Sequence, residues 1–271
     1  MNNAEGDGRM NLLQGKTALV FGVANDHSIA WGIAQSMHAQ GARLAFSYAN
    51  EALERRVRPL AESVGATFIE PCDVTSDEAI DAVFAKAAQS LGRVDALVHA
   101  IAFANREDLS NPYYATSRAG FHLAMDVSVY SFTALARACA PLMTEGGSMV
   151  TLTYYGGQKV VPHYNIMGVA KAALDMSTRY LASELGPRGI RVNAISAGPV
   201  RTLSAAGVSG FKKMYRKFAE IAPLRRPITL EDIGGAAVWL ASDLARTVTG
   251  EILFVDSGYN ILGIGSLEDE G

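Results

Sequence analysis

Short apolar runs alternate with longer helical patterns along almost the whole chain, and this alternation constrains the fold more than any other feature. The apolar runs are too short for stable helices and suit buried strands. We predict strands over residues 17–22, 43–48, 67–70, 95–101, 148–154, 191–196 and 251–255. We predict helices over residues 29–40, 51–63, 78–91, 121–143, 165–185 and 231–242, the first of them closed by Gly41.

Strands that alternate with helices require crossover connections, because parallel neighbours cannot be joined by a tight hairpin. The pattern therefore predicts an α/β fold, a doubly wound parallel sheet of seven strands with helices on both faces. No Pro- or Ser-rich linker and no repeat of solenoid length interrupts it, so residues 1–271 are predicted to form a single domain. Residues 1–10 and 263–271 are expected to be flexible ends.

The composition argues against several classes of protein. Hydrophobic residues make up 49% of the 271 residues and the formal net charge is −3, which disfavours a disordered chain and non-specific nucleic-acid binding. The uncharged residues 27–42 are too few and too polar to span a bilayer, and residues 1–10 lack the apolar segment of a secretory signal. The spacing of Cys72 and Cys139 matches no metal-binding or redox motif, and the five histidines have no ligand spacing. We therefore expect a cytoplasmic globule without a metal, a nucleic-acid partner or a membrane.

The loop after the first predicted strand is suited to a phosphate group. Gly22 would let the chain turn sharply away from the strand, and Ser28 at the start of the next helix could cap free amides. The remaining amide groups and the helix dipole favour a pyrophosphate. The loop is not G-x-G-x-x-G, so a tight turn without a ligand is an equal interpretation of this segment alone.

Several motifs in register are more specific than this loop. In order along the chain, from about residue 15 to residue 260, they are Gly22…Ser28-Ile29-Ala30, Cys72-Asp73-Val74, residues 98–103, Tyr154…Tyr164…Lys171, residues 191–202 and Gly250…Gly258. With this set the chain resembles the FabI type of enoyl-acyl-carrier-protein reductases, a divergent branch of the short-chain dehydrogenases. The resemblance implies a Rossmann fold and NADH-dependent reduction of the trans-2 double bond of enoyl-acyl-carrier-protein thioesters in type II fatty acid biosynthesis.

The resemblance also implies a role for single residues. The cofactor would lie against Gly22, Ser28 and Ile29 at its phosphates, Asp73 and Val74 at the adenine, Ile101 and Lys171 at the riboses, and Val200, Arg201, Thr202, Leu203 and Ser204 around the nicotinamide and phosphates. The substrate would contact Ala104, Tyr154, Tyr164 and Met167. A helix cap or turn carboxylate is the alternative for Asp73, and core packing is the alternative for Tyr154.

The residues after the second predicted strand favour NADH over NADPH. A 2′-phosphate needs a nearby cation, but residues 48–51 contain none and the first cation is Arg55, a full turn into the next helix. Ala49 departs from the Gln or basic residue often seen there in the family.

Tyr164 and Lys171 have the spacing that separates two chemistries. Seven residues apart on a helix, they differ by only about 20° around the axis and face the same way. Short-chain ketoreductases place Tyr and Lys four residues apart, a spacing absent here, which disfavours a carbonyl reductase. Tyr164 is predicted to donate to the enolate oxygen, because a free phenol with a pKa near 10 stays protonated at neutral pH. Lys171 would hold the nicotinamide ribose, and Tyr154 would be the family's second tyrosine near the substrate.

The resemblance implies a substrate lid at residues 200–226. Within them, residues 211–222 have one apolar helical face, and residues 201–226 carry seven Lys/Arg and one acid. A solvated surface helix is the alternative, but we predict that the basic face receives an acidic acyl carrier protein. The resemblance further implies a homotetramer. A non-catalytic dinucleotide-binding sensor is disfavoured, because Tyr154, Tyr164 and Lys171 are all present.

Overall fold

The computed structural model describes residues 11–200, 202 and 211–263. Its strands are β1 (Thr17–Phe21), β2 (Arg43–Tyr48), β3 (Ile69–Pro71), β4 (Ala96–His99), β5 (Gly147–Thr153), β6 (Ile190–Ala197) and β7 (Ile252–Val255). Its α-helices are α1 (Ile29–Ala39), α2 (Glu51–Ser63), α3 (Asp77–Ser90), α4 (Arg106–Ser110), α5 (Arg118–Met125), α6 (Ser131–Cys139), α7 (Asn165–Leu185), α9 (Phe211–Ile221) and α10 (Leu230–Ala241). Short helical turns are η1 (Tyr113–Ala115), η2 (Asp126–Tyr130), η3 (Ala140–Leu142), η4 (Tyr155–Gly157), η5 (Gly186–Arg188), η6 (Asp243–Ala245) and η7 (Tyr259–Ile261).

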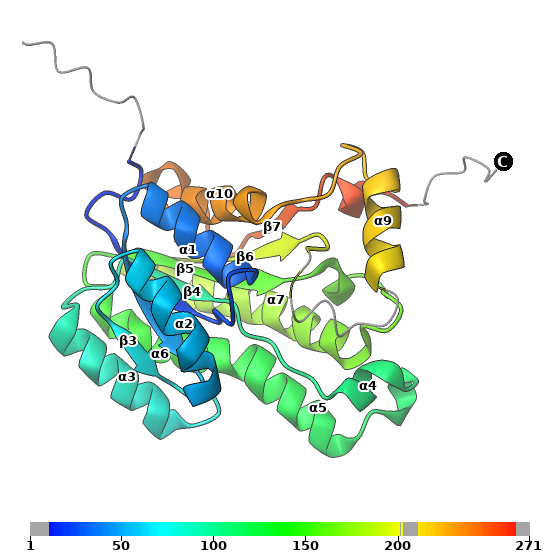
Figure 1. Ribbon diagram of the computed structural model, residues 1–271, viewed down its shortest axis with the longest axis horizontal. Coiled ribbons are helices and arrows are strands. Elements are labelled where there is room, and N and C mark those ends of the chain that lie inside the picture. The colour runs from blue at the N-terminus through cyan, green and yellow to red at the C-terminus, as the bar shows by residue number, and fades with distance from the viewer. Residues whose placement is uncertain (1–10, 201, 203–210, 264–271) are drawn as a thin grey trace, which may run out of the picture.

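All the described strands belong to one parallel sheet in the order β3-β2-β1-β4-β5-β6-β7 (Figure 1). The chain first builds outward from β1 to β3, then crosses back and builds in the other direction from β4 to β7. The point of reversal between β1 and β4 is where doubly wound sheets bind their ligands, beyond the carboxyl ends of the strands. The predicted doubly wound sheet of seven strands, the Rossmann fold, is confirmed.

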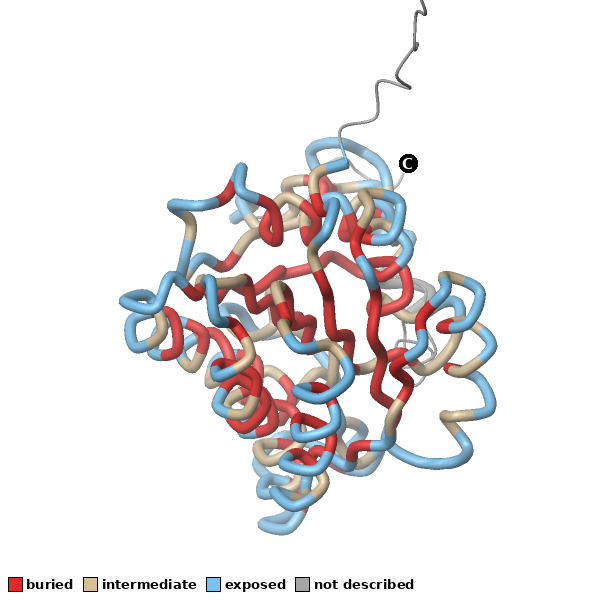
Figure 2. Tube along the Cα trace, turned by 90° about the vertical axis from the view of Figure 1, so that its left-hand side faces the viewer, coloured by how far each residue is buried: buried red, intermediate tan, exposed pale blue. Residues whose placement is uncertain are grey.

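Two hydrophobic clusters, one on each face, hold the sheet between layers of helices. One cluster joins the sheet to α1, α2 and α10, and the other joins it to α3, α6 and α7. The strands at the centre of the molecule are almost entirely buried (Figure 2). A parallel sheet covered on both faces explains why its strands read as continuous apolar runs rather than alternating ones.

The region predicted as one helix over residues 121–143 is built differently. The helical path begins earlier, at Arg118, because the Ser117 hydroxyl accepts the amide of Gly120 and caps α5. It then passes through a π-turn at η2 before α6, and ends in the 3-10 turn η3. Helix α4 was not predicted, and its five residues are too few to show a helical period.

Other predicted element ends differ from the observed ones by one or two residues. The strand predicted over residues 95–101 ends at His99, so Ile101 lies in the following loop, and the strand predicted over 148–154 ends at Thr153. Gly41 follows α1 with φ +86°, as predicted for a residue just past a helix end. None of the helices in the described part of the chain is long and apolar enough to cross a membrane.

Candidate active site

The predicted site residues within the described ranges converge on one edge of the sheet. Parallel strands present their carboxyl ends together, so loops from distant parts of the chain meet there. Gly22 follows β1, Asp73 and Val74 follow β3, Ile101 and Ala104 follow β4, Tyr154 follows β5, and Val200 and Thr202 follow β6. Ser28 and Ile29 begin α1, and Tyr164, Met167 and Lys171 lie at the start of α7. Arg201, Leu203 and Ser204 lie outside the described residues.

Gly22 makes the first turn possible. Its φ is +103°, and a Cβ added there would lie 2.2 Å from the carbonyl oxygen of Ala100. Any side chain at this position would therefore push apart the loops that follow β1 and β4, at the reversal point of the sheet. The glycine therefore allows the two backbones to lie close together.

Ser28 occupies the predicted cap position of α1, but it does not cap the helix. Its hydroxyl donates to the carbonyl oxygen of Asn25 at 2.6 Å and accepts from the amide of Ala24 at 3.4 Å. The predicted capping bond is therefore wrong, because the tight turn before the helix uses the hydroxyl first. The consequence favours a ligand, since the first amide groups of α1 and the helix dipole are left for an anion.

Asp73 acts as a turn carboxylate, one of the alternative roles considered for it. Its Oδ1 accepts hydrogen bonds from both the amide and the hydroxyl of Thr75, at 2.9 and 2.7 Å. The cap of α3 is instead Ser76. The side chain of Asp73 is exposed and Val74 beside it is buried, so the turn presents one polar and one apolar residue at the sheet edge.

The two tyrosines and the lysine come together where β5 ends against the start of α7. The rings of Tyr154 and Tyr164 meet edge to face, with centroids 4.8 Å apart. Lys171 Nζ donates to the carbonyl oxygen of Leu152 at 2.7 Å, which ties the lysine to the last residues of the same strand. Tyr154 and Tyr164 are half-buried, and only 5% of Lys171 is exposed.

Glycines allow this close approach of η4 to α7. A Cβ on Gly156 would lie 2.5 Å from the ring of Tyr164, and a Cβ on Gly168 would lie 2.8 Å from the carbonyl oxygen of Gly156. A Cβ on Gly157 would lie 2.9 Å from the backbone of Lys171. The backbone of η4 therefore packs closely against both Tyr164 and Lys171.

Burial sets the protonation states of these groups. It lowers the pKa of Lys171 to about 8, although the charge of Asp175 acts in the opposite direction. Burial also raises the pKa of Tyr154 to about 12, with a smaller contribution from Tyr259. The pKa of Tyr164 is raised further by burial and by the nearby Tyr154 and Asp175. At neutral pH the site therefore offers two phenol donors beside a cation.

The sequence and the fold were compared with known proteins. A profile described as enoyl-(acyl carrier protein) reductase matches residues 22–260. The chain belongs to this family. The enoyl-[acyl-carrier-protein] reductase [NADH] FabI of Bacillus cereus is 57% identical over 256 residues, which are 94% of this chain and 100% of that protein. The FabI protein of Aquifex aeolicus is 50% identical over 262 residues, 96% of this chain and 97% of that protein.

Solved structures of other enoyl reductases have the same fold. The Bacillus cereus enzyme, crystallised with NADP+ and indole naphthyridinone, superposes with a TM-score of 0.92 at 56% identity, covering 93% of this chain and 99% of that one. The enzyme of Anaplasma phagocytophilum in complex with NAD gives a TM-score of 0.91 at 51% identity, covering 94% and 98%. The family predicted from the sequence motifs is confirmed.

Periodicity and motif spacing missed several polar residues of this enoyl reductase site. The Ser128 hydroxyl, in the π-turn, bonds both the amide and the carbonyl of Phe103 and lies 3.8 Å from the sulfur of Met167. It thereby joins the loop after β4 to α7. His99 lies behind the site, bonded to Thr151 at 2.7 Å and Ser131 at 2.9 Å. Because burial lowers the pKa of His99 to about 3, it is neutral.

Asn165 is a further residue that the sequence did not reveal. Its side-chain amide donates to the carbonyl oxygens of Asp108, Leu109 and Asn111, at 3.4, 3.0 and 2.8 Å. Its φ is +40° and that of His163 is +63°, so residues in the left-handed region flank Tyr164 on both sides. The residue type alone was a partial indication, because after glycine Asn is among the residues that best tolerate a positive φ.

The predicted lid of this reductase is described in part. Helix α9 covers Phe211–Ile221, close to the predicted 211–222. Phe218 and Ala222 are buried, whereas Arg216 and Lys217 are exposed, as the helical pattern predicts. The ring of Phe218 packs on Tyr259 with centroids 4.9 Å apart, which fixes the end of α9 to the loop after β7. Within the described residues, no three His, Cys, Asp or Glu side chains are placed to share a metal ion.

Proposed function

We propose that Tyr164, Lys171 and Tyr154 carry out enoyl reduction in this protein, an NADH-dependent enoyl-acyl-carrier-protein reductase of type II fatty acid biosynthesis. The supporting observation is the grouping of these side chains at the end of β5 in a chain of this family. A single sheet carries all the site loops, which supports a single-domain reductase for residues 1–271.

The sheet edge fits a nicotinamide dinucleotide. Gly22 lets the loops after β1 and β4 lie close together at the reversal point. The uncapped start of α1 at Ser28 and Ile29 leaves amide groups that can bind the phosphates. We assign the adenine to Asp73 and Val74, the ribose to Ile101, and the nicotinamide side to Val200 and Thr202. The same assignment covers Arg201, Leu203 and Ser204, which lie outside the described residues. When bound, NADH supplies the hydride that reduces the double bond.

The protein's own residues deal with the charge that the reaction creates. Hydride addition at the β-carbon of an enoyl thioester places negative charge on the thioester oxygen. Tyr164 remains a phenol, because burial raises its pKa, so it can donate to that oxygen. Lys171 holds the nicotinamide ribose and adds a positive charge nearby. Ala104, Tyr154 and Met167 contact the acyl part of the substrate.

Substitution of the catalytic pair tests these roles with a crotonyl-type thioester and NADH, followed at the nicotinamide absorbance band. Tyr164→Phe removes the donor and should lower kcat by about 10²- to 10³-fold, the usual cost of one oxyanion donor. Lys171→Ala should lose affinity for NADH. Unchanged turnover in the first variant, or unimpaired NADH binding in the second, would contradict the corresponding role.

The same assay separates the alternative functions. A carbonyl reductase would consume NADH with a ketone but not with the thioester, and a dinucleotide-binding sensor would bind NADH without turnover. The spacing of Tyr164 and Lys171 and the family match both favour the enoyl reductase.

The residues around the end of β2 support NADH as the preferred cofactor. Arg58, a cation that acts on the Tyr48 hydroxyl, is already engaged, since its Nε donates to Glu54 at 2.9 Å. Burial raises the pKa of Tyr48, and hydrogen bonding to Glu54 adds to this, which places all three side chains in one cluster. A 2′-phosphate would have to compete with Glu54 for Arg58. A higher kcat/KM with NADPH than with NADH would refute this preference.

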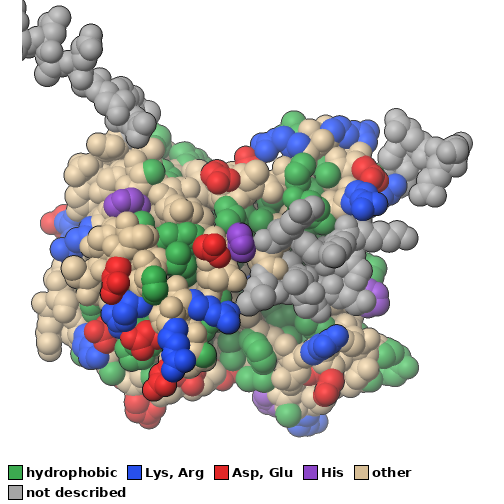
Figure 3. Space-filling model, in the orientation of Figure 1, with side chains coloured by type: hydrophobic (Ala, Val, Ile, Leu, Met, Phe, Trp, Pro, Cys, Tyr) green, Lys and Arg blue, Asp and Glu red, His purple; other side chains and the backbone are tan. Residues whose placement is uncertain are grey.

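The basic face of α9 is the proposed docking surface for the acyl carrier protein. Lys and Arg side chains gather over α9 and the chain that follows it, at the upper right of Figure 3. Arg216 and Lys217 are exposed there, and the side chains of Lys212 and Lys213 are outside the description. Phe218, on the opposite face, is buried, so the cations are free to meet an acidic partner while the apolar face covers the acyl chain.

Charge reversal tests the docking surface. Arg216→Glu with Lys217→Glu should raise KM for the carrier-bound substrate several-fold and leave KM for a short thioester unchanged. Arg246→Glu, compared with Arg216→Glu alone, is the matched control, because Arg246 is exposed but follows η6, before β7 begins. Equal effects of the α9 reversal on both substrates would reject the docking role.

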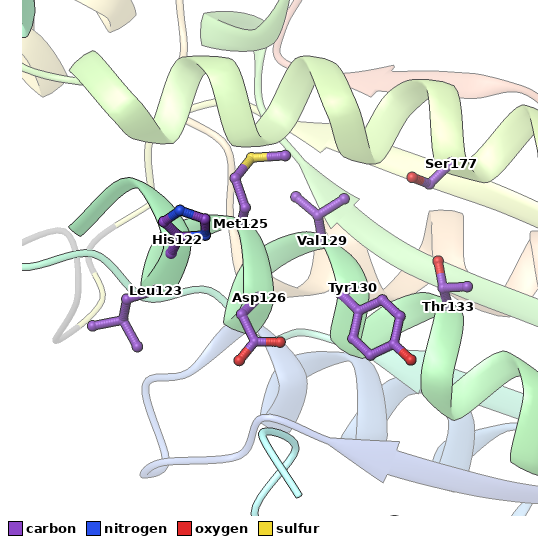
Figure 4. Close-up of a pocket in the computed structure, with 8 residues that line it drawn as sticks. All are labelled: His122, Leu123, Met125, Asp126, Val129, Tyr130, Thr133 and Ser177. Atoms are coloured by element: carbon purple, nitrogen blue, oxygen red, sulfur yellow. The ribbon is translucent and has the colours of Figure 1, made fainter. Parts of the chain in front are cut away.

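A homotetramer is the proposed assembly. Large apolar side chains on α5, η2 and α7 face outward, with Phe121 38%, Tyr130 46%, Met176 49% and Tyr180 66% exposed. The same helices line an open pocket of about 570 Å³ that includes Tyr130 and Ser177 (Figure 4). Such faces suit an isologous contact with a second copy. Light scattering should give four chains, and Tyr180→Asp should lower that number.

The cytoplasm is the proposed location. Cys72 and Cys139 are both free and buried, and burial raises the pKa of Cys72 to about 12, so its thiol is unreactive. Fractionation of cells that make the protein would test this location.

A further inference from the structure

Asp175 is a buried acid that the proposed reduction does not use. It lies four residues after Lys171 on α7, so the two side chains are neighbours on one face of the helix. Only 4% of Asp175 and 5% of Lys171 is exposed. The Oδ1 of Asp175 is buried without a hydrogen-bond partner, and so is the Oγ1 of Thr153, the residue after Leu152 on β5.

Lys171 has little other support for its charge. Its ammonium donates to a neutral acceptor, the carbonyl oxygen of Leu152. His99 on β4 is neutral, because burial lowers its pKa to about 3, and Tyr164 at the start of α7 is neutral because burial raises its pKa. Arg179, further along α7, acts on Asp175. Among the described groups that act on Lys171, Asp175 is the one that favours the charged form.

We propose that Asp175 is a positioning residue that keeps Lys171 protonated inside the buried site, an inference that rests on the proposed role of Lys171. An ammonium removed from water is strongly disfavoured unless an anion lies close by. The carboxylate supplies that anion from the same face of α7, one turn further along the helix. If Asp175 were neutral, Lys171 would lose its proton near physiological pH, and the ribose would lose its cation.

The protonation behaviour of the pair agrees with this geometry. Burial lowers the pKa of Lys171 to about 8, and Asp175 is what opposes a further fall. Burial raises the pKa of Asp175, while the charges of Arg179 and Lys171 act against that rise. Loss of the carboxylate should lower the pKa of Lys171 by about one unit, the lower end for an opposite charge at close range.

The test is the pH dependence of kcat/KM for NADH, with a crotonyl-type thioester, in the wild type and Asp175→Asn. This parameter reports the free enzyme. Its alkaline limb near pH 8 should follow Lys171, because burial raises the pKa of both tyrosines above that range. Asp175→Asn should move the limb down by about one pH unit, giving wild-type efficiency at pH 6 and about fivefold less at pH 8. Asp175→Glu should restore the limb. Glu184→Gln, an exposed acid on the same helix, should leave it unchanged.

Two further variants keep the result interpretable. In a Lys171→Arg background, Asp175→Asn should no longer shift the limb, because a guanidinium stays charged at these pH values. If Asp175→Asn does not accumulate as folded protein, Asp175→Ser takes its place with the same expected shift. An alkaline limb that stays in place, or a loss of activity equal at all pH values, would overturn the proposal. Wild-type protein without enoyl reduction would instead refute the proposed function itself.

Discussion

Replacing Lys171 with methionine is expected to stabilise the fold while abolishing NADH binding. Only 5% of Lys171 is exposed, and burial lowers its pKa from 10.5 to about 8. At pH 7 the lysine is charged in both the folded and the unfolded chain, so the folded chain bears the cost of a buried ammonium. With 1.36 kcal/mol for each pKa unit, that cost is about 3 kcal/mol.

Part of this gain is lost again. Methionine cannot donate to the carbonyl oxygen of Leu152, and one such hydrogen bond contributes about 1 kcal/mol. The net expectation at pH 7 is therefore that Lys171→Met raises the free energy of unfolding by about 2 kcal/mol. A functional residue that destabilises its own fold is an expected trade-off between stability and activity.

The pH dependence gives the prediction its sign. Between pH 8 and pH 10.5 the unfolded chain holds the Lys171 proton and the folded chain does not, so the wild type gains stability as the pH rises. The advantage of Lys171→Met should thus be complete below pH 8, fall by about 1.4 kcal/mol for each pH unit above it, and vanish by about pH 9.5. Urea unfolding at pH 7 and pH 10, at one protein concentration, measures both. Lys159→Met, at an exposed lysine, is the control and should show no such change.

A Lys171→Met variant that is less stable than the wild type at pH 7 would refute this reasoning. A difference in stability that does not change between pH 7 and pH 10 would refute it as well, because the penalty would then not be the charge. Tyrosine ionisation in the unfolded chain is common to both proteins and cancels in the difference.

Three other substitutions probe the site. Gly22→Ala should lower the free energy of unfolding more than Gly65→Ala and should weaken NADH binding in a fluorescence titration. Both glycines have positive φ, but an added Cβ would clash with Ala100 only at Gly22. Equal losses of stability would contradict the close approach. Asn165→Ala should destabilise the fold by about 1–2 kcal/mol and lower kcat more than it raises KM for NADH, since three carbonyl oxygens lose their donor. Unchanged kcat would show that the hydrogen bonds of Asn165 do not orient Tyr164. Phe218→Ala should raise KM for thioesters, because α9 loses the buried ring that packs on Tyr259. An unaltered KM would show that this ring does not affect substrate binding.

Much of the fold was predictable because its signals are local. Helix α2 begins after Asn50, whose side chain accepts the amide of Leu53, and its observed bounds match the prediction. Helix α7 matches as well, because its 21 residues repeat the apolar pattern over many turns. Where the signal was weak, as before α5, the prediction missed the cap at Ser117 and placed the helix start three residues late.

The site was predictable only where a motif marked it. Tyr154, Tyr164 and Lys171 were predicted from their spacing and from a resemblance, and their roles stay predictions. The sequence shows that Asp175 is four residues after Lys171, but no pattern in it indicates that both side chains become buried against β5. The π-turn that aims Ser128 at Phe103 and Met167 likewise has no sequence pattern of its own.

The sequence by itself determined the order of strands and helices, the parallel sheet and the reductase family, because periodicity, caps and motif spacing are properties of neighbouring residues. The tertiary structure alone decided that Ser28 leaves the start of α1 open and that Lys171 is buried beside Asp175. These properties depend on which distant segments exclude water from a group. A charge or a hydrogen bond gains its strength from that exclusion, which no local pattern records.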